Sequence, residues 1–239
     1  MGKLGFDVRS LVNRDNNIGQ LLVMVVLIIA LMTALSPDKF LRWYNFESLT
    51  YLFPELGVLS IAMLVAMLTG GIDLSIIGIA NVSAILAGLF FHAVIPRDVA
   101  AAGGGTAWVF VGILMSVVIG ALAGAFNGFL ITRLRVTPIL ATLGSGQIYT
   151  GIALVLTGGP AIVGFPAAWD WIGNGKLFGL AVPFVLFVGI ALAMAFLLAR
   201  TTFGVSLQLI GTNPKAAVFA GLDRTKMVFM SYVLTGTLA

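Results

Sequence analysis

Long apolar runs separated by short polar segments dominate this chain. Six of the runs have 18 or more residues, and about 20 apolar residues cross the hydrocarbon core of a bilayer as a helix. We therefore predict an all-α, polytopic transmembrane bundle that forms one domain over 1–239. The predicted spans are 18–35, 48–69, 76–94, 107–132, 138–157 and 177–199, with a partial seventh over 227–239. As a helix the last run would rise only about 20 Å, which predicts a chain cut off inside a span.

Composition supports a membrane protein and excludes several other classes. The chain is 60% hydrophobic and 9% charged, whereas soluble domains carry roughly 25% charged residues. It has no cysteine and a single histidine, His92, so disulfides, thiolate metal sites and His-rich metal sites are excluded. No P-loop motif, paired carboxylates or activated nucleophile is visible. We therefore expect that the chain is not an enzyme and binds no cofactor.

The distribution of basic residues predicts the orientation. If the N-terminus is cytoplasmic, the inner segments 1–17, 70–75, 133–137 and 199–226 hold nine of the thirteen Lys and Arg. Cytoplasmic loops of membrane proteins carry this excess. The net charge of +4 is spread over loops, which favours membrane orientation over nucleic-acid binding. The four tryptophans fall at outer boundaries, as an interfacial belt would; contact of Trp169 and Trp171 with a sugar or a partner is the alternative.

The segment 200–226 is a long polar stretch between two apolar runs, and it contains a short helix over 213–220 with both ends marked. Asn213 is a good N-cap and Pro214 suits the first helical position. Gly221 suits the left-handed position that ends a helix. The small side chains of Ala216, Ala217 and Ala220 would let another surface approach closely. The segment is therefore either a docking helix or an ordinary surface turn.

The sequence G-G-I-D-L-S at 70–75 interrupts the apolar pattern. Two glycines free the backbone, and Asp73 and Ser75 are suited to cap the next helix. A carboxylate at membrane depth is costly. Asp73 is therefore expected either in a cytoplasmic turn or in a discontinuous helix that faces a translocation path.

Glycines and polar residues also mark two of the predicted spans. Gly120, Gly124 and Gly128 share one helix face, which predicts close helix–helix packing, and Asn127 beside them is either interhelical glue or path lining. In 137–151, Thr142, Ser145 and Tyr149 share one face while Gln147 and Thr150 share another. Such a helix either faces a polar cavity or packs through Ser, Thr and Gly. The candidate path residues are Asp73, Asn127, Thr142, Ser145 and Gln147.

Four motifs in order resemble one family. They are G-G-I-D-L-S at 70–75, G-A-F-N-G-F-L-I-T-R-L-R-V at 124–136, A-T-L-G at 141–144 with L-T-G-G at 156–159, and F-G-V-S-L-Q-L-I-G-T-N-P-K-A-A-V-F-A-G-L at 203–222. From about residue 48 onward, the chain resembles the permease subunits of ribose-type monosaccharide importers of the ATP-binding-cassette (ABC) class. It departs from the family at Ile76-Ile77-Gly78, where Val-Gly is more common.

The resemblance implies a multi-pass protein of the bacterial inner membrane. Family members work with a second permease, identical or paralogous, with cytoplasmic ATPase subunits that use the ATP, and with a periplasmic sugar-binding protein. The family's coupling loop corresponds to 203–222, where Asn213, Pro214, Ala216, Ala217 and Gly221 match. The expected function is the translocation subunit of a monosaccharide importer.

Two other functions are weighed against it. The first is an ion-coupled secondary transporter of a small polar solute, with Asp73 or Glu55 essential. The second is a structural scaffold. A missing relay of acidic residues disfavours the first, and the capped helix disfavours the second.

Overall fold

The computed structural model describes residues 16–96, 99 and 104–239. The predicted cytoplasmic segment before Asn16 and the predicted outer residue Arg97 lie outside this part of the chain. Contacts divide the chain into two compact units, the first ending at Leu49 and the second running from Thr50 to Ala239, and each is described by itself.

The first unit holds an apolar helix and a short turn helix. Helix α2 covers Asn16–Leu35, α3 covers Pro37–Phe40, and α4 begins at Trp43. Between Leu21 and Leu35 the large apolar side chains of α2 are 41–68% exposed. A helix that is apolar on all sides belongs in a core or in a membrane, so these side chains are suited to lipid.

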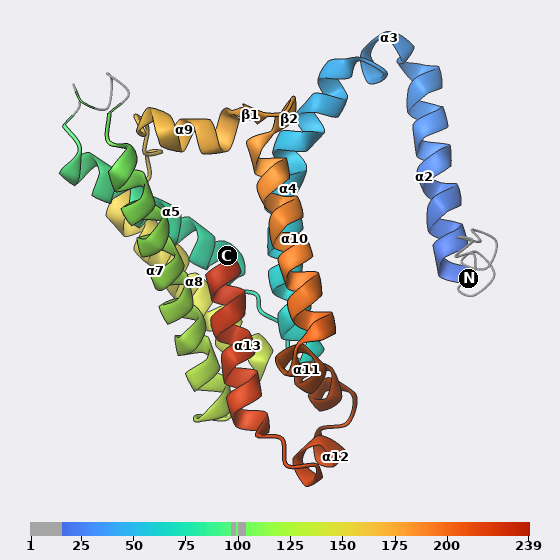
Figure 1. The fold of residues 1–239 in the computed structure, drawn as a ribbon, viewed down its shortest axis with the longest axis vertical. Coiled ribbons are helices and arrows are strands. Elements are labelled where there is room, and N and C mark those ends of the chain that lie inside the picture. Colours follow the sequence, from blue (N-terminus) through green and yellow to red (C-terminus); the bar gives the residue numbers. More distant parts are fainter. Residues whose placement is uncertain (1–15, 97–98, 100–103) are drawn as a thin grey trace, which may run out of the picture. The chain divides into compact units, whose positions relative to one another are not determined.

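The second unit is a bundle of long helices joined by short elements (Figure 1). It contains α4 (Trp43–Leu68, from Thr50), α5 (Ile76–Val94), α7 (Thr106–Thr132), α8 (Pro138–Thr157), α9 (Ala167–Asn174), the antiparallel pair β1 (Lys176–Leu177) and β2 (Leu180–Ala181), α10 (Val182–Arg200), α11 (Thr202–Thr212), α12 (Pro214–Phe219) and α13 (Arg224–Leu238). Among the described residues, α4, α5, α7, α8 and α10 are long and apolar enough to cross a membrane. The predicted polytopic helical fold is confirmed.

The helix bounds agree with the pattern at most places and differ at three. Helices α5 and α8 begin and end where predicted. Helix α4 begins at Trp43, before the predicted start at 48, and it runs through Pro54, because proline removes one backbone bond without ending a well-packed membrane helix. The predicted start at 177 is wrong: Phe178 and Gly179 have φ of 53° and 81°, which turns the chain into a hairpin, and α10 begins at Val182.

The third difference is α11, which lies where an irregular loop was expected. The Thr201 hydroxyl caps this helix by accepting from the Gly204 N–H. Leu207 and Ile210 on its inner face are fully buried. The helix also approaches the end of α4 closely, since a Cβ added at Gly211 would overlap the Leu68 carbonyl oxygen. The three-residue spacing of Leu207 and Ile210 is that of one helix face, but the polar residues around them made this pattern hard to recognise.

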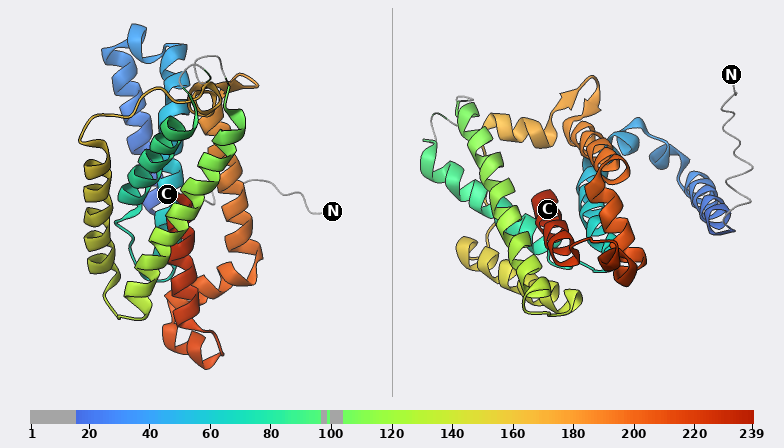
Figure 2. Two further views of the ribbon diagram at one scale, coloured as in Figure 1. Left: turned by 90° about the vertical axis from the view of Figure 1, so that its left-hand side faces the viewer. Right: turned by 60° about the horizontal axis from the view of Figure 1, so that its bottom comes forward.

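Helices α7 and α13 form the closest pair in the unit, and they lie side by side in Figures 1 and 2. A Cβ added at Gly120 would overlap the Gly236 carbonyl oxygen, and one at Gly124 would overlap that of Tyr232. The prediction that these glycines allow close packing is confirmed. The sequence did not indicate that the partner would be α13.

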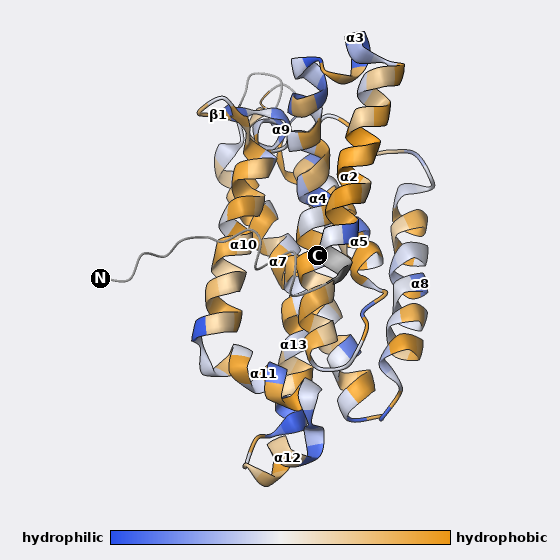
Figure 3. Ribbon diagram, turned by 90° about the vertical axis from the view of Figure 1, so that its right-hand side faces the viewer, coloured by the Kyte–Doolittle hydropathy of each residue, from blue (hydrophilic) through white to orange (hydrophobic). Residues whose placement is uncertain are grey.

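The two ends of the second unit differ in chemistry. At one end, Trp169 of α9 packs against Phe91 and Phe165 with ring centroids 5.2 and 6.2 Å apart, so Trp169 has a packing role, whereas Trp171 is 50% exposed. At the other end hydrophilic residues gather around α12 (Figure 3). Of the seven Lys and Arg that the structure describes in this unit, only Lys176 lies at the α9 end; the α12 end holds Arg133, Arg135, Arg200, Lys215, Arg224 and Lys226.

Candidate functional site: a buried polar cluster at a helix break

An extended segment, 71–75, separates α4 from α5. Gly70 turns the chain with φ of 79°, and the Gly71 N–H donates to the Ala66 carbonyl 3.2 Å away. Along the segment Gly71, Asp73 and Ser75 are buried, whereas Ile72 and Leu74 are exposed. The chain therefore passes back into the bundle as a strand-like piece before α5 begins.

The Asp73 carboxylate is the centre of the segment's hydrogen bonds. Its Oδ1 accepts from the Ser75 backbone N–H at 3.0 Å and from the Ser75 hydroxyl at 2.6 Å. Its Oδ2 accepts from the Thr235 hydroxyl of α13 at 2.8 Å. The side chain is fully buried. The predicted capping by Ser75 is wrong, because its side chain makes no cap bond.

Asn127 joins the cluster from α7. Its Nδ2 donates to the Ser75 hydroxyl oxygen at 2.6 Å, so the Asn127 amide binds α5 and α7 together. Its Oδ1 is buried without a hydrogen-bond partner. Of the two sequence interpretations, interhelical glue describes this contact directly.

Thr142 of α8 and Tyr232 of α13 satisfy the backbone of the extended segment. The Thr142 Oγ1 accepts from the Leu74 N–H at 3.1 Å and lies 3.3 Å from the Ile72 carbonyl oxygen. The Tyr232 hydroxyl donates to the same carbonyl at 3.5 Å. Non-helical backbone at membrane depth is tolerated only where protein or water satisfies it, and here polar side chains from two helices do so.

The cluster lies inside the bundle and not in a surface turn. Thr142 is four residues into α8, and Thr235 is eleven residues into α13. At 1.5 Å per residue the cluster is roughly 6–16 Å from the N-terminal ends of these two helices. The structure therefore places Asp73 in a break within the bundle.

Four of the five predicted path residues come together here, and Gln147 does not. Ser145 is 2% exposed, and its hydroxyl donates to the Thr142 carbonyl at 3.3 Å. The Tyr149 hydroxyl on the same face donates to the Ala123 carbonyl of α7 at 3.0 Å. Gln147 is exposed on the opposite face of α8. The two predicted faces of α8 are thus distinct, and only one of them meets the cluster.

Sequence reasoning missed the contribution of α13. Ser231, Tyr232 and Thr235 are fully buried, and Tyr232 and Thr235 reach the segment 71–75. Their spacing of three to four residues on one helix face was a usable signal. The run from Met227 is too short for a complete span, so its apolar pattern alone does not mark it as part of the bundle.

The short helix at the basic end has the predicted caps. The Asn213 Oδ1 accepts from the Ala216 N–H at 3.0 Å. At the other end Gly221 has φ of 85°, its N–H donates to the Val218 carbonyl, and the Leu222 N–H donates to the Ala217 carbonyl. This bond pattern is a Schellman motif. The six-residue helix α12 is therefore capped at both ends by residues that flank it.

The expectation that Ala217 lies on the accessible face of this helix is wrong. Ala217 is 4% exposed because it packs inward, while Val218 and Phe219 are 53% and 91% exposed. An apolar ring that is almost fully exposed on a polar end of the molecule is suited to contact with a partner. The accessible apolar surface of α12 is therefore Val218 and Phe219.

Helix α12 connects to the buried cluster through α13. After Gly221 the chain passes to Asp223, whose carboxylate caps α13 by accepting from the Lys226 N–H at 3.0 Å. The same helix then carries Tyr232 and Thr235 to the segment 71–75. Helix α13 thus links α12, through the turn at 220–223, to the helix break.

Comparison with known proteins agrees with a multi-spanning helical membrane protein. The family described as branched-chain amino acid transport system / permease component matches residues 45–239. The chain is 34% identical over 187 residues to the autoinducer 2 import system permease protein LsrD of Yersinia pseudotuberculosis serotype O:1b, and 33% identical to that of Yersinia pestis strain Pestoides F. Each match covers 76% of this chain and 53% of the relative. No solved structure matches the chain.

The fold and the comparisons therefore define the class of ABC-type transport permeases of the inner membrane. The chain belongs to the family of permease components of these systems. The resemblance to ribose-type permeases, stated from four motifs, is confirmed at the level of the family. The chain spans about half the length of the curated relatives that it matches.

Proposed function

We propose that this chain is a membrane-spanning part of an ATP-driven importer and that α12 docks on a separate ATPase subunit. The observation that carries the proposal is the connection from the exposed Phe219 of α12, through α13, to the buried Asp73. Phe219 lies on a helix capped by Asn213 and Gly221, and α13 leads from there to the hydrogen bond between Thr235 and Asp73.

The path suggests how ATPase motion reaches the bundle. Because Gly120 and Gly124 allow backbone contact with α13, α7 and α13 would move as one body. A displacement of α12 would then act on the break at 71–75, where side-chain hydrogen bonds replace the helical ones. An interaction with the ATPase that differs between two arrangements of this break would bias the equilibrium between them.

The proposed solute is a monosaccharide or a related small polar molecule. The LsrD relatives are named for import of autoinducer 2, and the sequence motifs resemble those of ribose-type permeases. A second permease, identical or paralogous, would complete the translocation path. A periplasmic binding protein would deliver the solute at the α9 end, where Trp171 is exposed. ATP would be bound by the partner, and this chain would bind no cofactor.

An ion-coupled transporter is the alternative. It requires a carboxylate that gains and loses an ion during transport. Glu55 is exposed on α4, and both Asp73 oxygens already accept hydrogen bonds within the chain. Family membership and this arrangement favour the ATP-driven importer.

The experiment that tests docking compares Phe219→Asp with Phe178→Asp. Phe178 is 95% exposed in the hairpin between β1 and β2, at the end of the unit opposite α12, so it is a matched control. Phe219→Asp should lose co-purification of the ATPase from detergent, because a charged carboxylate cannot enter an apolar contact. Phe178→Asp should retain the ATPase at the wild-type level.

Ala217→Glu is a poor test, because a glutamate at the buried position 217 would disturb the fold itself. The comparison is valid only if both Phe variants elute from size-exclusion chromatography as a single species, as wild type does. Retention of the ATPase by Phe219→Asp, or equal loss in both variants, would overturn docking through α12.

A further inference from the structure

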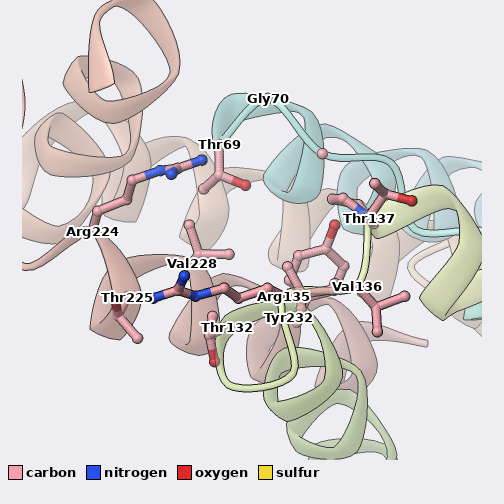
Figure 4. A pocket seen from close by; sticks show the side chains of 13 residues that line it. Thr69, Gly70, Thr132, Arg135, Val136, Thr137, Arg224, Thr225, Val228 and Tyr232 are labelled. Atoms are coloured by element: carbon pink, nitrogen blue, oxygen red, sulfur yellow. The ribbon is translucent and has the colours of Figure 1, made fainter. Parts of the chain in front are cut away.

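A polar cavity of about 630 Å³ lies at the basic end of the second unit and borders the cluster, because Gly71 and Tyr232 form part of its wall. Small-molecule sites commonly measure roughly 300–1,000 Å³. Figure 4 shows Arg224 reaching from α13 toward Thr69 and Arg135 reaching from the turn after α7 toward Thr225. Two guanidinium groups thus enter the same cavity from different elements.

Neither arginine has an acidic partner among the residues that the structure describes. Asp223, next to Arg224 in the chain, uses its carboxylate to cap α13, and it does not line the cavity. Two like charges in one cavity repel each other unless an anion lies between them. Both arginine side chains are exposed, so an anion can reach them, and an anion bound between them would offset their repulsion.

Two helix N-termini open on the same cavity. Thr137 and Pro138 at the start of α8 line it, as do Arg224 and Thr225 at the start of α13. The N-cap Thr137 makes no side-chain cap bond; Pro138 has no N–H, so the uncapped donors of this turn are the N–H groups of Ile139 and Leu140. Free N–H groups and the helix dipole favour anions at such ends. The α13 end already carries the Asp223 carboxylate, so the helix-dipole contribution comes from α8, and it has the same sign as that of the two arginines.

The backbone conformation of Arg135 explains how its side chain reaches the cavity. Its φ is 56°, a left-handed conformation that glycine adopts without strain and that other residues adopt rarely. The turn places the Arg135 side chain in the cavity, whereas Arg133, two residues earlier, does not line it. The same turn therefore supplies a test position and a matched control.

We propose that this cavity binds a phosphate group through Arg135 and Arg224. Guanidinium groups and helix N-termini are the donors that recognise phosphate. The group could be carried by a soluble phosphate ester or by a phospholipid headgroup, and the chemistry of recognition is the same. A bound phosphate would hold α13 against the segment 69–71, beside the break. The inference does not depend on docking of an ATPase.

The test uses the 239-residue chain in phosphatidylcholine nanodiscs, with inorganic phosphate and ribose 5-phosphate as soluble probes, measured by calorimetry. A parallel sample in discs containing phosphatidylglycerol is analysed by native mass spectrometry for retained lipid. Arg135→Gly and Arg224→Gln should each weaken binding about tenfold, because each removes a charge-assisted contact. Arg133→Gln and Lys226→Gln should bind as wild type does.

Arg135→Gly should fold, because glycine suits the left-handed backbone; Arg224→Gln provides a second variant. Binding of the soluble probes supports a phosphate-ester site, and selective retention of phosphatidylglycerol supports a lipid site. The proposal is overturned if wild type binds neither source, or if the control variants weaken binding as much as the test variants do. ATPase co-purification is a separate measurement, so either proposal can fail alone.

Discussion

At the scale of single residues, Asp73 holds the helix break together. Three donors from Ser75 and Thr235 meet its two oxygens in a fully buried site. Asparagine has the same shape and offers one oxygen and one amino group. Its oxygen would accept from Ser75, and its amino group would donate to the Thr235 hydroxyl, whose own hydrogen would then bind the Tyr232 carbonyl 2.9 Å away.

This geometry predicts different results for two substitutions. Asp73→Asn should keep the fold and retain ATP-driven uptake. Asp73→Ala should destabilise the protein, because each buried donor left unpaired costs about 1–3 kcal/mol. Thermal unfolding in detergent and uptake in proteoliposomes with the ATPase are the measurements. A stable Asp73→Asn protein that has lost uptake would show that the charge is needed and would restore the ion-coupled alternative.

At the scale of elements, the contact between α7 and α13 depends on the absence of side chains. A Cβ at Gly124 would overlap the Tyr232 carbonyl oxygen, and backbone cannot move aside as a flexible side chain does. The glycine spacing predicted a contact face, and the structure shows that α13 is the partner. The linkage from α12 to the break requires that this pair remain closely packed.

Gly124→Ala should therefore destabilise the bundle by about 1–3 kcal/mol, the usual effect of overpacking. Gly144→Ala and Gly151→Ala in α8 are the controls, because a Cβ at either position meets nothing within 4 Å. Alanine also has the higher helix propensity, so the controls should be neutral or slightly more stable. Thermal midpoints in one detergent compare the three variants. Equal midpoints for Gly124→Ala and wild type would mean that α7 and α13 are not closely packed.

At the scale of the whole molecule, the structure gathers the basic residues of the second unit at one end, and the predicted orientation makes that end cytoplasmic. Six of its seven described Lys and Arg lie at the α12 end, and cytoplasmic surfaces of membrane proteins are rich in these residues. Because the chain has no cysteine, a single introduced cysteine can be labelled without background.

Phe219→Cys should react with a membrane-impermeant maleimide only in inverted vesicles, which expose the cytoplasmic face. Phe178→Cys should react only in intact spheroplasts. Both side chains are more than 90% exposed, so accessibility within the protein is equal. Labelling with the opposite pattern would reverse the orientation and place α12 out of reach of a cytoplasmic ATPase.

Local signals were sufficient for much of this fold. Apolar runs predicted the helices because a span must bury its backbone polar groups within itself. Asn213 and Gly221 predicted the ends of α12 because capping involves only neighbouring residues. The bounds failed at 177, where a positive φ at Phe178 turned the chain, and at 48, because α4 already begins at Trp43.

The sequence by itself determined that the chain is a helical membrane protein, which motifs it carries and where the short helix is capped. Only the tertiary structure decided which polar residues meet. Asp73 and Thr235 are 162 residues apart, and a hydrogen bond between them depends on how α5, α7, α8 and α13 pack. The burial of Ala217 and the exposure of Gln147 were decided in the same way, because residue type and periodicity define a helix face but not the element that covers it.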